Sequence, residues 1–204
     1  MELLLSIDDT DNLESPGTGK LLEAYRLHIE DSGLGSTSGI SRHQLYVHPD
    51  VPYTSHNSSM CFPLHTDKSF REIRESAVHH LEQVAAVGSD PGLALVDLEA
   101  LVRRSRLIDF GLAAKRSVLS KSAAYDLAAE CGVALSEHGG TGDGVIGALA
   151  AIGLRLQGSD GRFRGALSGF TPGAETRVAD LLLHPGVGEV FILEPGVLVG
   201  RDPG

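Results

Sequence analysis

The sequence of 204 residues predicts a single compact α/β domain, spanning residues 1–204, with a mixed sheet flanked by helices. Short apolar runs of strand length alternate along the chain with longer segments of helical length. The segments that join them are short, and no internal repeat or low-complexity linker interrupts them. Hydrophobic residues make up 42% of the chain and charged residues 22%, a composition that is sufficient for a full core.

Composition also limits the classes of function. The formal net charge of -10 argues against binding of nucleic acid over a broad face, and so against direct tRNA binding by this chain alone. Cys61 and Cys131 are isolated and do not form a zinc site. The N-terminus lacks the pattern of a signal peptide, and no apolar run is long enough to cross a membrane, so we expect a cytoplasmic protein.

The first half of the chain contains five segments whose apolar residues follow the pattern of a strand or a helix. Residues 3–7 are a short apolar run typical of a buried strand, and residues 59–64 resemble it. Residues 43–48 alternate between apolar and polar side chains, which predicts another strand. Residues 18–31 and 67–87 carry apolar side chains at helical spacing.

The second half continues the alternation. We predict a strand at 93–96, helices at 98–115 and 120–131, a strand at 133–136, and a helix that begins after the glycines near residue 142. Residues 154–157 and 163–167 resemble a hairpin around the turn residues 159–161. A last helix at 174–183 and a strand at 190–193 complete the pattern, followed by a polar tail.

The glycine-rich run at 137–153 is the most informative stretch. Its glycines allow backbone N–H groups to converge on a phosphate at the start of the following helix, but a flexible turn before a buried helix explains the same pattern. No Lys-Ser/Thr pair follows the last glycine, which excludes a standard Walker A loop. Gly142, Gly144 and Gly147 match the dinucleotide fingerprint, with Asp160 near the position of a ribose-binding acid, but too little chain follows for a doubly wound sheet.

Three carboxylates follow the first predicted strand. In extended chain Asp9 and Asp11 project to one side and Asp8 to the other. Carboxylates so close together repel one another unless they are solvated, capped by N–H groups or neutralised by a cation such as Mg²⁺. The sequence therefore predicts a metal site, with an Asx turn or helix-capping loop as the alternative.

A loop with two prolines, at 49–57, forms a third candidate. His48, His56 and Asn57 lie in or beside this stiff segment and can line a cleft. Surface histidines are the simpler interpretation of the pattern alone.

Taken together, these stretches resemble one family. Residues 7–11 read I-D-D-T-D, residues 48–53 read H-P-D-V-P-Y, and residues 142–153 read G-D-G-V-I-G-A-L-A-A-I-G, with a weaker echo in D-P-G-L at 90–93. In this order and spacing they resemble the N-terminal kinase-like domain of archaeal tRNA(Ile) agmatidine synthetase, TiaS. The resemblance covers residues 3 to about 167.

The resemblance implies an ATP- and Mg²⁺-dependent enzyme. By analogy, Asp8, Asp9 and Asp11 are catalytic and hold the metal, and Thr18 stands near the threonine that is phosphorylated in the family. The implied nucleotide-binding residues are Gly140, Thr141, Gly142, Asp143, Gly144, Val145, Ile146 and Gly147, and the implied substrate residues are Tyr53, His56 and Asn57.

Two departures alter the expected substrate. The family's K-T-R after the prolyl turn is Thr54-Ser55-His56 here, so two cations are missing, and residues beyond 167 leave no room for the ferredoxin-like, OB and zinc-ribbon domains that hold tRNA in the family. We therefore expect a stand-alone relative, a phosphotransferase or ligase-like enzyme acting on a small-molecule or protein acceptor. The alternatives are a non-catalytic nucleotide-binding regulatory module and, with less support, an NAD(P)-dependent reductase; oligomer formation is left open.

Overall fold

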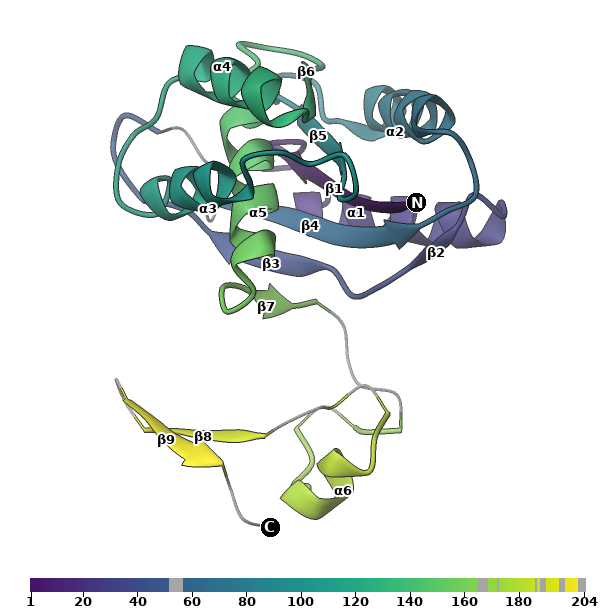
Figure 1. The fold of residues 1–204 in the computed structure, drawn as a ribbon, viewed down its shortest axis with the longest axis vertical. Coiled ribbons are helices and arrows are strands. Elements are labelled where there is room, and N and C mark those ends of the chain that lie inside the picture. Colours follow the sequence, from purple (N-terminus) through teal and green to yellow (C-terminus); the bar gives the residue numbers. More distant parts are fainter. Residues whose placement is uncertain are drawn as a thin grey trace. The chain divides into compact units, whose positions relative to one another are not determined.

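The computed structural model describes residues 1–51, 57–164, 169–171, 173–185, 187, 190–194 and 197–201, from residue 191 onward by the backbone alone. The chain forms two compact units, Met1–Arg164 and Gly165–Gly204, and each is described by itself (Figure 1). Whether both units act as one domain stays a prediction.

The first unit is built on a seven-stranded sheet with β1 (Glu2–Asp8) near its centre. The strand order is β6-β5-β1-β4-β3-β7, and β2 (Ser36–Thr37) also pairs with β4. The remaining strands are β3 (Ser41–Gln44), β4 (Ser58–His65), β5 (Gly92–Asp97), β6 (Ala134–Glu137) and β7 (Arg162–Phe163). The predicted α/β sheet with flanking helices is confirmed.

The pairings among the described strands are all antiparallel, where the sequence predicted a mixed sheet. β1 is a continuous apolar run because helices cover both faces of the sheet, and its five residues Leu3–Ile7 are all buried. Such runs are typical of parallel strands, but burial on both faces produces them in either direction. Strand direction therefore could not be inferred from this pattern.

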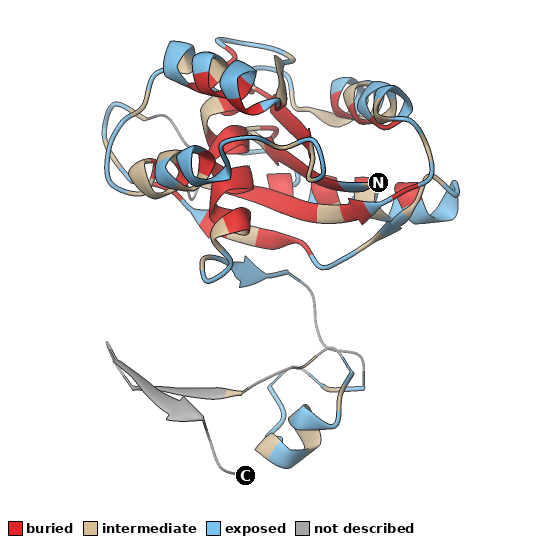
Figure 2. Ribbon diagram, viewed as in Figure 1, coloured by how far each residue is buried: buried red, intermediate tan, exposed pale blue. Residues whose placement is uncertain are grey.

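Two helical layers enclose the sheet (Figure 2). On one face, Leu3 and Leu5 pack with Leu22 and Ile29 of α1 (Thr18–Asp31) and with residues of α2 (Phe70–Val84). On the other face, Leu4 packs with α5 (Gly144–Gln157), which lies beside α3 (Arg104–Ala113) and α4 (Lys121–Cys131).

α5 is the central helix of its layer and is almost entirely buried. Its small residues bring it close to α3, because a Cβ atom on Gly153 would lie 1.9 Å from the carbonyl oxygen of Leu107. Close packing on all sides explains why this helix lacks a polar face.

Most predicted elements are confirmed, with shifted ends. α1 has the predicted bounds, and α4 begins after Ser120, whose side chain accepts a hydrogen bond from the Ala123 N–H at 3.2 Å. α2 begins later than predicted because Ser69 and Glu72 form a capping box at its start, and it ends at Val84. α3 begins only at Arg104, and the strand predicted at 43–48 lies at Ser41–Gln44.

The predicted hairpin at 154–157 and 163–167 is wrong. Residues 154–157 are the last turn of α5, which ends at Gly158 with a positive φ of 89°, and Phe163 in β7 pairs with Ser41 of β3. A buried helix and a buried strand present the same continuous apolar pattern over so few residues. Residues 165–167 lie outside the described part.

The second unit contains a short helix, α6 (Val178–Leu182), and the pair β8 (Phe191–Glu194) and β9 (Val197–Arg201). The helix is shorter than predicted, and β9 occupies part of the predicted polar tail. Within the described ranges, no helix has the length and apolar character needed to span a membrane.

Candidate functional site

The acidic run and the start of α5, far apart in sequence, meet at one pocket in the first unit. β1 delivers the acids to its end, and the α5 N-terminus lies beside them. The lining residues are Asp8, Asp9, Asp11, Thr18, Tyr46, Asp50, Val51, Asn57, Ser58, Ala114, Ser117, Val118, Leu119, Asp143, Gly144, Ile146 and Gly147.

Asp8 and α5 are in direct contact at Gly147. A Cβ atom at Gly147 would lie 1.6 Å from Asp8 Oδ2, so a side chain there and this carboxylate cannot share the space. The Gly147 carbonyl oxygen accepts a hydrogen bond of 2.8 Å from Ser59 Oγ of β4, which fixes the helix to the sheet. The glycine that sequence analysis assigned to phosphate binding thus also makes room for an acid.

The chain turns sharply after β1. Asp9 has a φ of 50°, in the left-handed region that non-glycine residues rarely adopt. This turn corrects the prediction that Asp8 points away from Asp9 and Asp11, because that prediction assumed extended chain through residue 11. All three residues line the same pocket.

Asp11 holds the first turn of α1. Its Oδ1 accepts hydrogen bonds from the Thr18 N–H at 3.3 Å and from Thr18 Oγ1 at 2.5 Å. Thr18 is buried, with 5% of its surface exposed, and Thr10 Oγ1 donates to it at 3.1 Å. Asp11 thus caps the start of α1, as the alternative predicted, while metal binding by Asp11 stays a prediction. Asn12 Oδ1 forms an Asx-type turn with the N–H groups of Glu14 and Ser15.

Asp8 and Asp9 carry the unbalanced charge of the pocket. Burial raises the pKa of Asp8 well above its usual range, and the nearby Asp9 carboxylate adds to this effect. Burial, Asp90, Asp11 and Asp143 raise the pKa of Asp9 to about 6. None of the described residues lining the pocket is basic, so this end strongly favours a cation or a proton.

The glycine loop wraps around acids of the chain itself. The Thr141 N–H donates to Asp90 Oδ1, while Lys121 Nζ donates to the Thr141 carbonyl oxygen at 2.6 Å and to Glu137 Oε2 at 2.8 Å. Gly140, Thr141 and Gly142 are not among the lining residues of the pocket. They precede the pocket-lining residues Asp143 and Gly144, and the bonds of Thr141 to Asp90 and Lys121 hold this part of the loop in place.

The C-terminal part of the loop reaches the pocket. Asp143, Gly144, Ile146 and Gly147 line it, whereas Val145 is fully buried in the core. The N–H groups of Gly144 and Ile146 donate to the carbonyl oxygens of Asp90 and Asp143. These N–H groups are therefore already bonded, although the positive end of the helix dipole still faces the pocket.

Part of the pocket lining is apolar. Ala114, Val118 and Leu119 line it together with Tyr46, whose ring stacks on His48 at a centroid distance of 5.3 Å. Asn57 is held by a hydrogen bond of 2.6 Å from its Nδ2 to the Tyr46 carbonyl oxygen. These apolar residues were not predicted from the sequence, because a loop after a helix gives no periodic signal. The predicted substrate residues Tyr53 and His56 lie outside the described residues.

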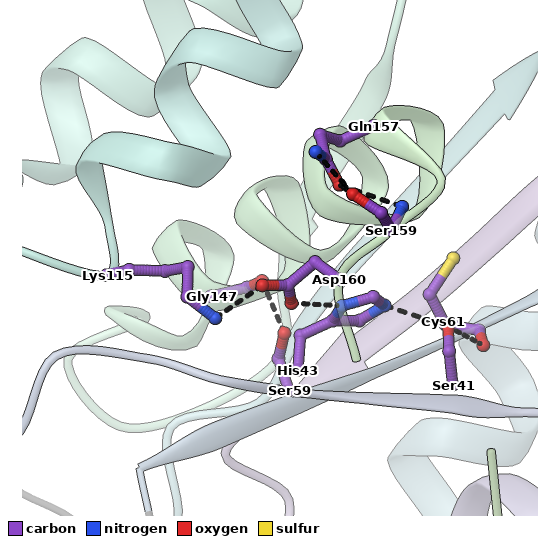
Figure 3. Close-up of polar contacts among 9 residues, drawn as sticks. All are labelled: Ser41, His43, Ser59, Cys61, Lys115, Gly147, Gln157, Ser159 and Asp160. Atoms are coloured by element: carbon purple, nitrogen blue, oxygen red, sulfur yellow. Dashed lines mark hydrogen bonds and ion pairs between the residues drawn. The ribbon is translucent and has the colours of Figure 1, made fainter. Parts of the chain in front are cut away.

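A polar network anchors the wall formed by residues 114–119 (Figure 3). Lys115 Nζ donates to Asp160 Oδ2 at 2.5 Å, and Asp160 Oδ1 lies 3.0 Å from His43 Nδ1. His43 Nε2 in turn lies 2.8 Å from Ser41 Oγ. Asp160 thus has structural partners and does not line the pocket, which removes the ribose-binding acid from the dinucleotide interpretation.

The charges of this network are balanced. Burial raises the pKa of Asp160, but hydrogen bonds from Lys115 and His43 outweigh it and hold the pKa below its usual value. Burial lowers the pKa of His43 despite its contact with Asp160. Ser41, His43 and Asp160 follow each other as in a hydrolase triad, but Ser41 and His43 are buried, so no substrate reaches them.

The pocket combines acids, a helix N-terminus and apolar side chains in an α/β domain, a mixture that is typical of a site for a small polar ligand. Neither family models nor curated proteins match the sequence. Among solved structures, a tRNA fluorescent labeling enzyme matches at 27% identity with a TM-score of 0.65, over 75% of this chain and 36% of that chain. A complex of TiaS with an isoleucine tRNA and ATP matches at 26% identity with the same TM-score and coverage.

A complex of TiaS with the tRNA, AMPCPP and agmatine also matches, at 26% identity with a TM-score of 0.63. The chain is therefore similar in structure to part of TiaS, the tRNA agmatidine synthetase, and the predicted resemblance is confirmed. It spans about a third of the length of the structures it matches.

Proposed function

We propose that this chain binds ATP together with Mg²⁺ in the pocket between β1 and α5 and transfers a phosphoryl group, as a phosphotransferase or ligase-like enzyme. The observation that carries the proposal is the meeting of Asp8, Asp9 and Asp11 with the start of α5 in one pocket. The solved structures that resemble the chain include complexes with ATP and AMPCPP, which supports the same ligand.

The residues present fit Mg²⁺. Within the described residues, no three His, Cys, Asp or Glu side chains form a ready-made metal cluster. Mg²⁺ does not require one, because it commonly takes one or two carboxylates, water and substrate phosphates. Asp8 and Asp9 supply carboxylates whose mutual repulsion a cation would relieve, and a divalent ion would also neutralise the phosphates of ATP.

The pocket lining has charged and apolar residues, as the phosphates and the adenine of a nucleotide require. The acids and the α5 N-terminus would face the phosphates and metal. Val118, Leu119 and Tyr46 would cover the adenine, where apolar contact is favourable. Gly140, Thr141 and Gly142 would act by holding the loop in place.

Thr18 is the proposed catalytic residue. Its hydroxyl already donates to Asp11 Oδ1 at 2.5 Å, so Asp11 is placed to take the proton. Loss of that proton would let Thr18 Oγ1 take up the γ-phosphoryl group of ATP, with ADP as the leaving group. The group would then pass to an acceptor, either a small molecule or a partner protein, in the cytoplasm.

The burial of Thr18 favours a second candidate, a nucleotide-binding module without turnover. Only 5% of its surface is exposed, and three hydrogen bonds hold its hydroxyl oxygen. Such a module would bind Mg²⁺ and ATP tightly and release no ADP above a control without protein.

Calorimetry with ATP, with and without Mg²⁺, tests the proposal. We expect binding only when Mg²⁺ is present, because the pocket repels free triphosphate, and a loss of at least about tenfold in affinity in Asp9→Asn. Asp126→Asn removes an exposed carboxylate elsewhere and serves as the matched control. Equal binding of ATP by both variants would contradict the ATP site at Asp9. Phosphorylation of Thr18 by ATP, detected by mass spectrometry, would distinguish a phosphotransferase from a nucleotide-binding module without turnover.

A further inference from the structure

Three arginines gather on one face of the sheet at its β7 edge. Arg42 of β3 and Arg162 of β7 are direct partners in the register, so their side chains project to the same face. Arg164, two residues further on, projects to that face as well. Its Nη1 lies 2.9 Å from the position that a Cβ atom on Gly19 would take, so its guanidinium lies against the first turn of α1.

This arrangement places positive charge where it is unfavourable. Like charges directly opposite each other on neighbouring strands are destabilising, and a cation at a helix N-terminus opposes the helix dipole. In the described part of the chain, none of these three arginines has a salt bridge; Arg42 Nε donates 2.9 Å to Ser58 Oγ.

Other arginines of the same chain are neutralised. Arg103 and Arg106 both contact Glu130, and Arg26 contacts Glu23 and Glu30. The chain has 27 acidic residues against 17 Lys and Arg, so acids were available to pair with the three. Arg162 and Arg164 are exposed, so a ligand can reach them, and a cluster without a salt bridge among the described residues of an acidic protein fits an anionic ligand.

The cluster adjoins the pocket. Ser58, which accepts the hydrogen bond from Arg42, lines the pocket. Thr18 also lines it and directly precedes Gly19, the glycine that lies beside the Arg164 guanidinium. Thr18 thus stands between two regions of opposite charge, the acids on one side and the arginines on the other. The arginines provide cations beside a pocket whose described lining has none.

We propose that Arg42, Arg162 and Arg164 form an anion site at the N-terminus of α1 that binds a phosphate group carried by a small acceptor. Guanidinium groups bind phosphate in a bidentate manner. The start of α1 adds a favourable dipole, although its Thr18, Lys20 and Leu21 N–H groups already donate to Asp11 Oδ1 and to the Gly17 carbonyl oxygen. Three arginines on a chain of net charge -10 are too few to follow a polymeric backbone, which favours one phosphate group. The identification of this phosphate as the acceptor's rests on the proposed function.

Titration with inorganic phosphate in the absence of Mg²⁺, followed by ¹⁵N NMR, tests the site, with sodium chloride at equal ionic strength as the reference. We expect the amide of Gly19 and the Nε–H of Arg164 to shift, and Arg164→Gln and Arg42→Gln each to weaken binding roughly tenfold. Arg74→Gln, an exposed arginine of α2, is the matched control and should bind as the unmodified chain does. No specific shift at Gly19, or equal loss in all three variants, overturns the proposal.

Two further arms separate this inference from the proposed function. Asp9→Asn should lose binding of ATP with Mg²⁺ but keep binding of phosphate, so either site can fail without the other. A single-stranded RNA of about ten nucleotides should bind no better than phosphate. Tight RNA binding that falls steeply with salt and depends on the same arginines would overturn the assignment to a small acceptor.

Discussion

The two ends of α5 hold carboxylates in opposite circumstances. At its start, Asp8 and Asp9 lie beside further acids, and the pKa of both is raised. Beyond its end, Asp160 is paired with Lys115 and His43, and its pKa is lowered. Asp160 is thus neutralised by other residues of the chain, whereas no salt bridge neutralises Asp8 or Asp9 within the described residues, so a proton or a cation would stabilise them.

The largest effect is expected at the contact between Asp8 and α5. In Gly147→Ala the new Cβ atom would lie 1.6 Å from Asp8 Oδ2, so the carboxylate must leave its place or the helix must shift. We expect binding of ATP with Mg²⁺ to be lost and the free energy of unfolding to fall by about 2 kcal/mol. Calorimetry and urea denaturation measure the two effects.

Gly17→Ala is the matched control, because a Cβ atom there has no neighbour within 4 Å and the residue has a φ of -63°. Gly17 is the N-cap of α1, where glycine is preferred over alanine, so the change should cost up to about 1 kcal/mol and leave binding of ATP unchanged. If Gly147→Ala binds ATP as well as Gly17→Ala does, the contact between Asp8 and α5 does not matter to the site, and the contrast between the two ends loses its functional meaning.

The sequence predicted the acid end better than the balanced end. Asp8, Asp9 and Asp11 were found because three acids after a buried strand exceed what a turn needs, and Gly147 because glycine recurs at the start of a helix. His43 and Asp160 were not linked, since they are far apart in sequence and Asp160 fell in a predicted hairpin that is in fact the exit from α5. Tertiary pairing of this kind leaves no local periodicity to read.

The balanced end should show a smaller effect. Asp160→Asn removes the charge that pairs with Lys115 and leaves a buried imidazole with a weaker partner. We expect about 1–2 kcal/mol less stability at pH 7 and a modest loss of affinity for ATP, because Lys115 anchors the pocket wall. Asp126→Asn, an exposed acid on α4, is the control, and equal unfolding curves for the two variants would show that the network is not stabilising.

The pH dependence of this contribution has a definite sign. The pKa of Asp160 is lower in the folded protein, so its stabilising effect is present above the ordinary aspartate pKa and is lost as the pH falls through the lowered value. Between pH 5 and 7 the contribution of Asp160 should therefore be constant.

The smallest effect, with the opposite sign, is expected from Asp9. Its pKa is about 6 in the folded protein, above the ordinary 3.8, so the folded state takes up a proton more readily than the unfolded state. Its contribution should therefore destabilise the protein as the pH rises from about 4 through 6, and Asp9→Asn should be more stable at pH 7 by on the order of 1 kcal/mol, given solvent screening. Urea denaturation at pH 5 and 7 measures this, and Mg²⁺ should stabilise the unmodified chain more than the variant. A variant that is less stable at pH 7, or equally stabilised by Mg²⁺, would mean that Asp9 is already neutralised within the fold as Asp160 is.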